Sequence, residues 1–354
     1  MKASSIGKKT LRVITRQKAV VAIIVMMVMM LFFDTKFYTS YSILEMLRSA
    51  AILEIVAFGV TVAVICGGCD LSVGGTLCLG GILAIMVMNA GLPIWLAFVV
   101  ALAAGAAVGF INGFLVVQQK CEPFIITLGM GILLKGICQQ ITNAHPLGCK
   151  NPSFMDISNA KLFGAVPSLV VYMLLLGAAF YYLMRYTSYG RNCYAIGGNY
   201  DVAKYSGIKV IPIKWTAFVI SGMTATLAGV LLSSRMNTGN SVYGDTTGML
   251  VNCGVVIGGT SFAGGEGGIL QSFIGLMAVQ MLSTCMSALS VDGFWQKLIE
   301  GLMIVAIMCP VMSLVATVLF KEPSFGMWVH TWGCNMPMAL CWQMLYCGPL
   351  SRFI

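Results

Sequence analysis

The stretch PIWLAFVVALAAGAAVGFINGFLVVQ, residues 93–118, decides the class of fold. None of its 26 residues is Lys, Arg, Asp or Glu, and about 20 apolar residues suffice for a helix to cross a bilayer. Its apolar residues are continuous rather than alternating, which is not the pattern of a membrane β-barrel strand. The stretch therefore predicts a transmembrane helix.

The whole chain shares this apolar character. Of its 354 residues, 58% are hydrophobic and only 9% are charged, and the mean hydropathy is +0.90. A soluble domain carries about 25% charged residues, and so few charges could not cover the surface of a soluble protein of this size. The composition excludes a soluble enzyme and a disordered chain, and it predicts an all-α polytopic membrane protein.

Ten apolar stretches predict ten transmembrane helices. The expected spans are 19–34, 44–66, 72–90, 93–118, 123–142, 167–185, 213–234, 246–262, 268–289 and 294–319. Residues 1–18 form a basic cytoplasmic N-terminus, residues 19–319 the transmembrane domain, and residues 320–354 an atypical tail rich in Trp and Cys. Because no small-residue cleavage site follows the first stretch, an uncleaved signal anchor is favoured over a cleaved signal peptide.

Basic residues gather on one predicted side of the membrane. With the N-terminus in the cytoplasm, fourteen of the 21 Lys and Arg lie inside, six lie outside, and Lys135 falls within a span. Cytoplasmic loops carry an excess of basic residues, so the chain is predicted to be N-in and C-in. The same rule explains the net charge of +9 without nucleic acid as a partner.

No chemistry-bearing cluster stands out in the sequence. The thirteen Cys are scattered through apolar stretches and their number is odd, so they imply no disulfide framework. No paired carboxylates, His cluster or Ser/His/Asp set falls on one predicted side. We therefore expect no catalytic residues, no metal site and no cofactor in this chain.

The longest predicted cytoplasmic loop, residues 186–212, is the most informative segment. Gly197 and Gly198 are expected to break the chain, and Asn199 is a good N-cap residue. Residues 200–206 can form two helical turns, with Gly207 ending them. A short capped helix thus lies between two spans on the basic side, either along the membrane surface or presented to a cytoplasmic partner.

Four segments, in order along the chain, resemble one family. They are CDLSVGG (69–75), EPFIITLG (122–129), GRNCYAIGGNYDVAKYSGIKV (190–210) and VVIGGTSFAGGEGG (255–268). These segments are similar to motifs of the permease subunits of ribose/galactose/xylose-type ABC sugar importers, the inner-membrane components of binding-protein-dependent transport systems. The resemblance runs from about residue 50 to residue 310.

The resemblance implies a membrane permease subunit that translocates a monosaccharide-like solute. An extracytoplasmic sugar-binding protein would deliver the solute, a cytoplasmic tandem-cassette ATPase would drive transport, and a second permease subunit, identical or different, would complete the pathway. The chain would lie in the bacterial cytoplasmic membrane as a multi-pass protein. It contains no G-x-x-x-x-G-K-[ST] motif, which agrees with an ATPase on another polypeptide.

The resemblance also assigns candidate residues. The ATPase-coupling loop would comprise Gly190, Arg191, Ala195, Ile196, Gly197, Gly198, Asn199, Ala203, Ser206 and Gly207. Turns and helix breaks would be formed by Asp70, Ser72, Gly74, Pro123, Thr127, Gly258, Gly259, Gly264 and Gly265. From its place before the third span, Asp70 is expected to N-cap that helix. The Gly-rich run 258–268 is expected to be a tight turn.

Polar residues inside apolar spans are candidates for the solute pathway, since a charge inside the membrane is costly. These candidates are Glu54, Asn112, Lys135 and Asn252. Glu54 either lines the pathway or pairs with Lys135, whereas Glu300 and Lys297 are expected to pair with each other. Small residues at 105, 109 and 113 lie on one helix face, where they allow close helix packing.

Two features depart from the family pattern. The family carries an acidic pair just before the segment that begins at Val255, whereas residues 248–253 (GMLVNC) contain no carboxylate and Asp245 lies upstream. The tail after residue 320 also differs. The alternative function that the residues leave open is an ion-coupled secondary transporter, with Glu54 and Lys135 in the relay; a membrane-embedded enzyme is a third class without a supporting residue set.

Overall fold

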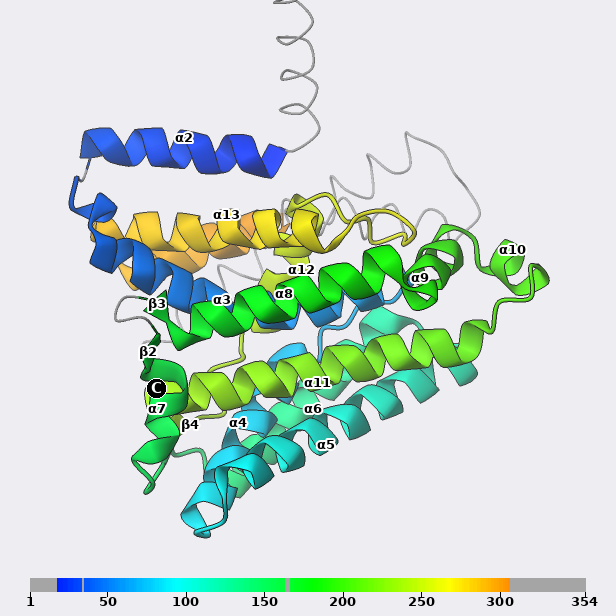
Figure 1. Ribbon diagram of the computed structural model, residues 1–354, viewed down its shortest axis with the longest axis horizontal. Coiled ribbons are helices and arrows are strands. Elements are labelled where there is room, and N and C mark those ends of the chain that lie inside the picture. Colours follow the sequence, from blue (N-terminus) through cyan, green and yellow to red (C-terminus); the bar gives the residue numbers. More distant parts are fainter. Residues whose placement is uncertain (1–17, 34, 163–165, 306–354) are drawn as a thin grey trace, which may run out of the picture. The chain divides into compact units, whose positions relative to one another are not determined.

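The computed structural model describes residues 18–33, 35–162 and 166–305. Expectations for residues 1–17, including most of the basic N-terminus, and for residues 306–354, including the tail, lie outside these ranges. The chain divides into two compact units, residues 1–281 and 282–354, and each is described by itself. In both units the described residues are almost entirely helical (Figure 1).

Six helices among the described residues are long and apolar enough to cross a membrane. They are α3 (Ser40–Ile65), α5 (Ile94–Gly113) with its π-helical continuation η2 (Phe114–Gln118), α6 (Pro123–Thr142), α8 (Ser168–Tyr186), α11 (Val210–Met236) and α13 (Ile269–Ala288). Three shorter apolar helices are α2 (Lys18–Phe33), α4 (Val73–Asn89) and α12 (Thr247–Ile257). These nine helices occupy the first nine predicted spans.

Two helix boundaries differ from the predicted ones for clear reasons. Helix α11 begins at Val210 and includes Pro212 in its first turn, where a proline costs nothing because that N–H has no helical partner. Helix α12 ends at Ile257 rather than 262, because Gly259 takes a φ of +106°, a backbone conformation open to glycine.

The remaining elements of the first unit connect the apolar helices. They are η1 (Thr35–Tyr38), α7 (Ser153–Asn159), α9 (Ser188–Gly198), α10 (Tyr200–Tyr205) and four strands of two residues each. Strand β1 (Leu147–Gly148) pairs antiparallel with β4 (Thr238–Gly239), and β2 (Lys161–Leu162) pairs antiparallel with β3 (Val166–Pro167). The connection between the fifth and sixth predicted spans therefore contains α7 and strands β1, β2 and β3.

Helix α11 forms the centre of the first unit and packs against α3, α4 and α5 (Figure 1). A Cβ atom added at Gly105 would lie 2.4 Å from the carbonyl oxygen of Gly222, and one added at Gly222 would lie 2.2 Å from the carbonyl oxygen of Gly105. The glycine stripe predicted on α5 therefore packs within the chain, against α11, where only glycine lets the backbones approach this closely.

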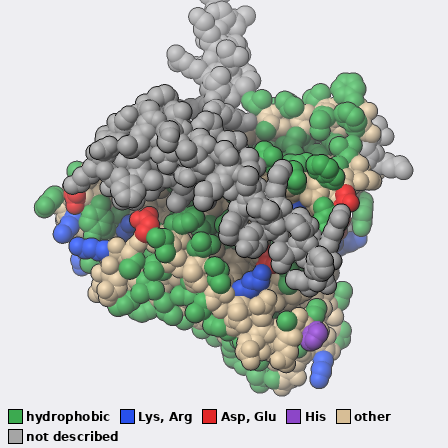
Figure 2. Space-filling view, turned by 180° about the vertical axis from the view of Figure 1, so that it is seen from behind, with side chains coloured by type: hydrophobic (Ala, Val, Ile, Leu, Met, Phe, Trp, Pro, Cys, Tyr) green, Lys and Arg blue, Asp and Glu red, His purple; other side chains and the backbone are tan. Residues whose placement is uncertain are grey.

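The helices differ in how much of them the chain itself covers. In the most apolar window of α3, 83% of the residues are buried, against 17% in α6. On the face seen in Figure 2, hydrophobic side chains are spread over the described surface, whereas charged side chains are few. The uncovered apolar surface of α6 is therefore available to lipid or to another subunit.

The second unit contributes the end of α13 and helical residues 293–305. Ser283 donates its hydroxyl hydrogen to Glu300 at 2.8 Å. The expected pairing of Glu300 with Lys297 is wrong, because no ion pair joins them in the part of the chain that the structure describes. Glu300 is instead hydrogen-bonded across the turn that joins α13 to the helical residues 293–305.

Candidate functional site: a helix break, a cavity and a glycine junction

The segment between α3 and α4 holds a fully buried carboxylate. Asp70 Oδ1 accepts hydrogen bonds from the backbone N–H of Ser72 at 3.0 Å and from the Ser72 hydroxyl at 2.6 Å. Asp70 Oδ2 accepts one from the hydroxyl of Ser221 on α11 at 2.7 Å. The expected N-cap role of Asp70 is wrong: Ser72 occupies the cap position of α4. Asp70 instead fixes the break to α11.

Side chains from three other helices converge on the same break. Asn112 on α5 donates to the Ser72 hydroxyl at 2.9 Å, and Asn252 on α12 donates to the carbonyl oxygen of Asp70 at 2.9 Å. On α6, the hydroxyl of Thr127 lies 3.2 Å from the carbonyl oxygen of Cys69, and Pro123 occupies the first turn. Asn112 and Asn252 are fully buried, so both asparagines hold the break together.

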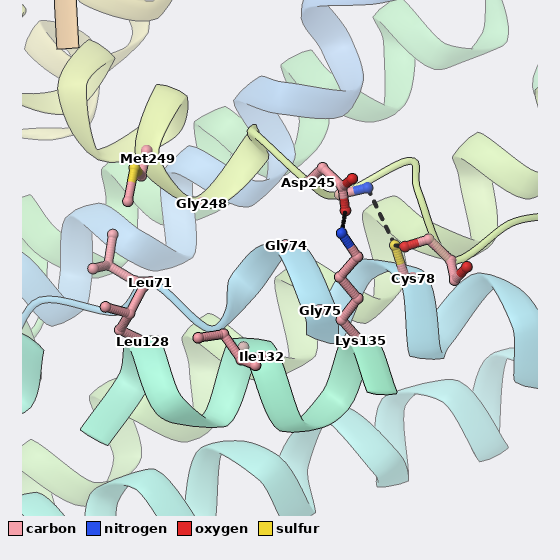
Figure 3. Close-up of a pocket in the computed structure, with 13 residues that line it drawn as sticks. Leu71, Gly74, Gly75, Cys78, Leu128, Ile132, Lys135, Asp245, Gly248 and Met249 are labelled. Atoms are coloured by element: carbon pink, nitrogen blue, oxygen red, sulfur yellow. Dashed lines mark hydrogen bonds and ion pairs between the residues drawn. The ribbon is translucent and has the colours of Figure 1, made fainter. Parts of the chain in front are cut away.

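A cavity of about 360 Å³ lies between α4, α6 and the segment that leads into α12 (Figure 3). Gly74, Gly75 and Cys78 line it from α4, and Lys135 lines it from α6. Gly74 lets α4 pack closely against the segment before α12, since a Cβ at this position would lie 2.2 Å from the carbonyl oxygen of Gly244. Neither Asn112 nor Asn252 is among the lining residues.

Lys135 and Asp245 point toward each other across this cavity (Figure 3), with Lys135 Nζ 2.8 Å from Asp245 Oδ1. The hypothesis that Lys135 pairs with Glu54 is wrong, because the lysine has this other partner. Both groups are more than a third exposed, at 39% and 36%, so the pair contributes only about 0–1 kcal/mol to stability. The ion pair therefore adds little to the stability of the fold, and its significance is that it places two charged groups in the cavity.

Glu54 lies elsewhere, in the buried middle of α3. Neither oxygen of its carboxyl group has a hydrogen-bond partner in the residues that the structure describes. The structure thus does not bring Glu54 and Lys135 together as a relay.

The predicted cytoplasmic loop folds into two helices, α9 and α10. As expected, Asn199 caps α10: its side-chain oxygen accepts from the backbone N–H groups of Asp201 and Val202, both at 3.1 Å. Gly207 follows the helix with a φ of +82°, as expected for a glycine that ends a helix. The expected chain break at Gly197 and Gly198 is wrong, because both residues complete the last turn of α9.

The candidate coupling residues divide into a buried and an exposed set. Ile196 and Ala203 pack with Val210 in a small apolar cluster that joins α9, α10 and α11, and Gly190 lies directly against the carbonyl of Met184. The exposed members are Arg191, Ala195, Gly198, Asn199, Ser206 and Gly207. Figure 1 shows α10 at the end of α9, apart from the long helices.

Four glycines, Gly67, Gly197, Gly264 and Gly265, bring three segments into backbone contact; we call them the glycine junction. A Cβ at Gly197 would lie 1.9 Å from the carbonyl oxygen of Ile65 and 2.3 Å from the nitrogen of Gly265. The Gly265 N–H itself donates to that Ile65 carbonyl at 2.9 Å. The end of α9 therefore touches both the end of α3 and the turn between α12 and α13.

Side chains reinforce the glycine junction. The hydroxyl of Tyr194 on α9 donates to the carbonyl oxygen of Gly267 at 3.0 Å, and Lys214 Nζ on α11 donates to the carbonyl oxygen of Gly67 at 3.4 Å. Gly264 and Gly265 take φ values of +87° and +74°. Gly258 also packs tightly, since a Cβ there would lie 2.0 Å from the Gln271 carbonyl oxygen. The expected tight turn is confirmed.

The sequence indicated several members of these sites but not how they meet. Ser221 and Asp245 were missed as site residues, although Asp245 was the nearest carboxylate to the missing acidic pair. Among the described residues, no group of three or more His, Cys, Asp or Glu is placed to hold a metal.

Comparisons with known proteins agree with this architecture. Residues 42–308 match the family described as branched-chain amino acid transport system / permease component, and residues 293–354 match a family described as a domain of unknown function. No solved structure matches this chain.

Several curated relatives extend over most of the chain. The ribose import permease protein RbsC of Haemophilus influenzae is 31% identical over 83% of this chain and 92% of its own length. The D-allose transport system permease protein AlsC of Escherichia coli K12 is 32% identical over 76% of this chain and 83% of its own length. The xylose transport system permease protein XylH of the same strain is 29% identical over 84% and 91%.

The helical fold and these matches define a polytopic membrane permease. The chain belongs to the family of transport-system permease components that matches residues 42–308. It is thus a multi-pass protein of the cytoplasmic membrane and no enzyme, and ATP hydrolysis belongs to a separate subunit. The family resemblance read from the four sequence motifs is confirmed.

Proposed function

We propose that the chain is the permease subunit of an ABC importer that translocates a monosaccharide-like solute. Its relatives named above are permeases for ribose, allose and xylose. We propose as partners an extracytoplasmic sugar-binding protein, a cytoplasmic tandem-cassette ATPase and a second permease subunit. The ATPase supplies the energy, and this chain supplies the pathway and the mechanical link to it.

Ten spans with both termini in the cytoplasm fit this role. The distribution of Lys and Arg supports this orientation, which places α9 and α10 on the side where ATP is available. Helix α10 offers a surface for the ATPase there: Val202 and Tyr205 are 61% and 87% exposed. Large apolar groups in water at the tip of a short helix are typical of a contact surface.

The observation that carries the mechanism is the glycine junction. When the ATPase closes and moves α10, the Asn199 cap and the cluster around Ile196 make α9 move with it. Gly197 is in direct backbone contact with Ile65 and Gly265, so no compressible side chain absorbs the displacement. The movement therefore reaches α3 and the turn before α13.

From α3 the movement passes to the helix break. Asp70 is hydrogen-bonded to Ser221 of α11. Side chains of α5, α6 and α12 are hydrogen-bonded to the same segment. A displacement of the break shifts α4, which lines the cavity of Figure 3. Such coupled movement of packed helices is the basis of alternating access in transporters.

We propose this cavity as part of the solute pathway. The cavity offers both hydrogen-bond donors and acceptors through Ser241, Lys135 and Asp245. Sugar hydroxyls need both, because each hydroxyl donates and accepts hydrogen bonds. Asp245 takes the place of the missing acidic pair in this role. The buried Asn112 and Asn252 stabilise the helix break and do not line the pathway. The ion-coupled secondary transporter is disfavoured because Glu54 and Lys135 are not in contact.

Uptake by reconstituted proteoliposomes tests the proposal. The permease is purified together with its partner ATPase, and the cognate binding protein is loaded with radiolabelled ribose, allose, xylose or leucine. We expect uptake of a sugar that requires ATP and the binding protein and that persists with a protonophore. Uptake of leucine alone would overturn the substrate class, and uptake that requires an ion gradient but no ATP would overturn the transport class.

A further inference from the structure

A second cavity, of about 460 Å³, lies between the end of α8, helix α9 and the start of α13. Helices α8 and α13 are both long and apolar enough to span the membrane. Because the C-terminal end of one and the N-terminal end of the other meet here, the cavity lies at a membrane surface. It is separate from the solute cavity between α4 and α6.

Two guanidinium groups, those of Arg185 and Arg191, line this cavity. Neither forms an ion pair with a carboxylate in the ranges that the structure describes. Arg191 is held in place by its hydrogen bonds to the carbonyl oxygen of Tyr186 at 3.5 Å and the hydroxyl of Ser188 at 2.9 Å. Glu266 lies nearby in the chain but is exposed and does not line the cavity.

The backbone adds to this positive charge. The first turn of α13, a helix of 20 residues, faces the cavity with Ile269, Leu270 and Gln271, and the first N–H groups of a helix have no acceptor within it. Arginine side chains and helix N-termini both bind phosphate groups in proteins. The cavity therefore suits a phosphate ester.

Apolar and aromatic side chains in and beside the cavity favour a lipid over a free anion as its ligand. Met184 and Leu270 line the cavity, and Leu270 is 55% exposed, so an acyl chain could lie against it. Tyr181, Tyr182 and Tyr186 are exposed along the last turns of α8, as in the aromatic belts at membrane interfaces. A free phosphate would use the arginines but none of these groups.

We propose that this cavity binds the headgroup of an anionic phospholipid, with Arg185 and Arg191 on its phosphate. Basic pockets between transmembrane helices are known to take anionic headgroups. Gln271 lines the cavity, and its side-chain oxygen has no hydrogen-bond partner among the described residues. A rotation of this side chain into the cavity would let the oxygen accept from a headgroup hydroxyl, which favours phosphatidylglycerol. The bound lipid joins α8, α9 and α13, and so it supports the glycine junction from the membrane side.

Native mass spectrometry of the full-length permease tests the proposal. The protein in detergent is titrated with phosphatidylglycerol and with phosphatidylcholine, as wild type, as R185A/R191A and as R185K/R191K. The control is K204A/K209A, which removes two exposed charges from the same loop. Each arginine at a membrane surface contributes about 1 kcal/mol, or about fivefold in affinity. R185A/R191A should therefore bind phosphatidylglycerol about 30-fold more weakly, whereas R185K/R191K and the control should stay close to wild type.

Other outcomes contradict the lipid site. Equal binding of phosphatidylglycerol by all four proteins, or no preference over phosphatidylcholine, would show that the arginines do not select an anionic headgroup. Displacement of the lipid by an equimolar amount of inorganic phosphate would assign the cavity to a free anion. Loss of ATPase co-purification with unchanged lipid binding in R185A/R191A would assign it to the ATPase. None of these results bears on which solute is transported.

Discussion

The substitution Gly197→Ala perturbs the packing of the glycine junction and leaves the exposed surface of α10 unchanged. The added Cβ would lie 1.9 Å from the Ile65 carbonyl oxygen, whereas ordinary contact begins at 3.4 Å. Two backbones, rather than a flexible side chain, would have to separate by about 1.5 Å. Forced overpacking of this kind costs about 1–3 kcal/mol.

The next residue gives a matched control. Gly198 also lies in α9, and a Cβ added there would meet no atom within 4 Å. Gly198→Ala should therefore leave the junction unchanged, and it should favour α9 by up to about 1 kcal/mol, because alanine is the better helix former. The two variants make the same glycine-to-alanine change at adjacent positions of α9, and only the change at position 197 creates a clash.

ATP-driven uptake into proteoliposomes, measured beside thermal stability and ATPase co-purification, checks this prediction. If the strain falls on the state in which α9 contacts α3, a cost of about 1–3 kcal/mol lowers the population of that state about 5- to 150-fold. We expect Gly197→Ala to reduce uptake accordingly while the ATPase still co-purifies, and Gly198→Ala to behave like wild type. Equal uptake and equal stability of the two variants would refute the role of the junction.

Three further predictions concern the α10 cap, the solute cavity and the helix core. Asn199→Ala removes both capping hydrogen bonds of α10, so it should destabilise that helix by about 0.5–2 kcal/mol and weaken ATPase co-purification, whereas Asn199→Asp should preserve both. Lys135→Met should lower uptake with almost no change in melting temperature, because both members of the ion pair with Asp245 are more than a third exposed; a charge-swapped K135D/D245K protein that recovers no uptake would speak against the pair. Gly222→Ala, which would place a Cβ 2.2 Å from a backbone oxygen of α5, should lower the melting temperature in detergent, while Gly129→Ala on α6, with no atom within 4 Å, should not.

Local features of the fold could be read from the sequence. Continuous apolar runs place the spans because each helix satisfies its own backbone hydrogen bonds inside the membrane. The cap of α10 was equally readable, since Asn199 and Gly207 act on backbone groups within three residues of themselves. Such short-range chemistry does not depend on the rest of the chain.

Contacts between distant segments could not be read in this way. Lys135 and Asp245 are 110 positions apart, and only the packing of α6 beside the segment before α12 brings them together. Gly197 and Gly198 look alike in sequence and both suggested a chain break. The structure separates them, because Gly197 faces Ile65 and Gly265 whereas Gly198 faces open space.

The most direct test of the coupling role is a photo-cross-linking amino acid at position 205, where Tyr205 is 87% exposed, in the intact complex of permease and ATPase. We predict an adduct with the ATPase whose yield changes between ATP-bound and nucleotide-free complexes. The same amino acid at position 150, in the loop on the opposite predicted side, should give no adduct. A co-purifying ATPase that forms no adduct from position 205, or that reacts equally from position 150, would contradict the assignment of α10 as the coupling helix.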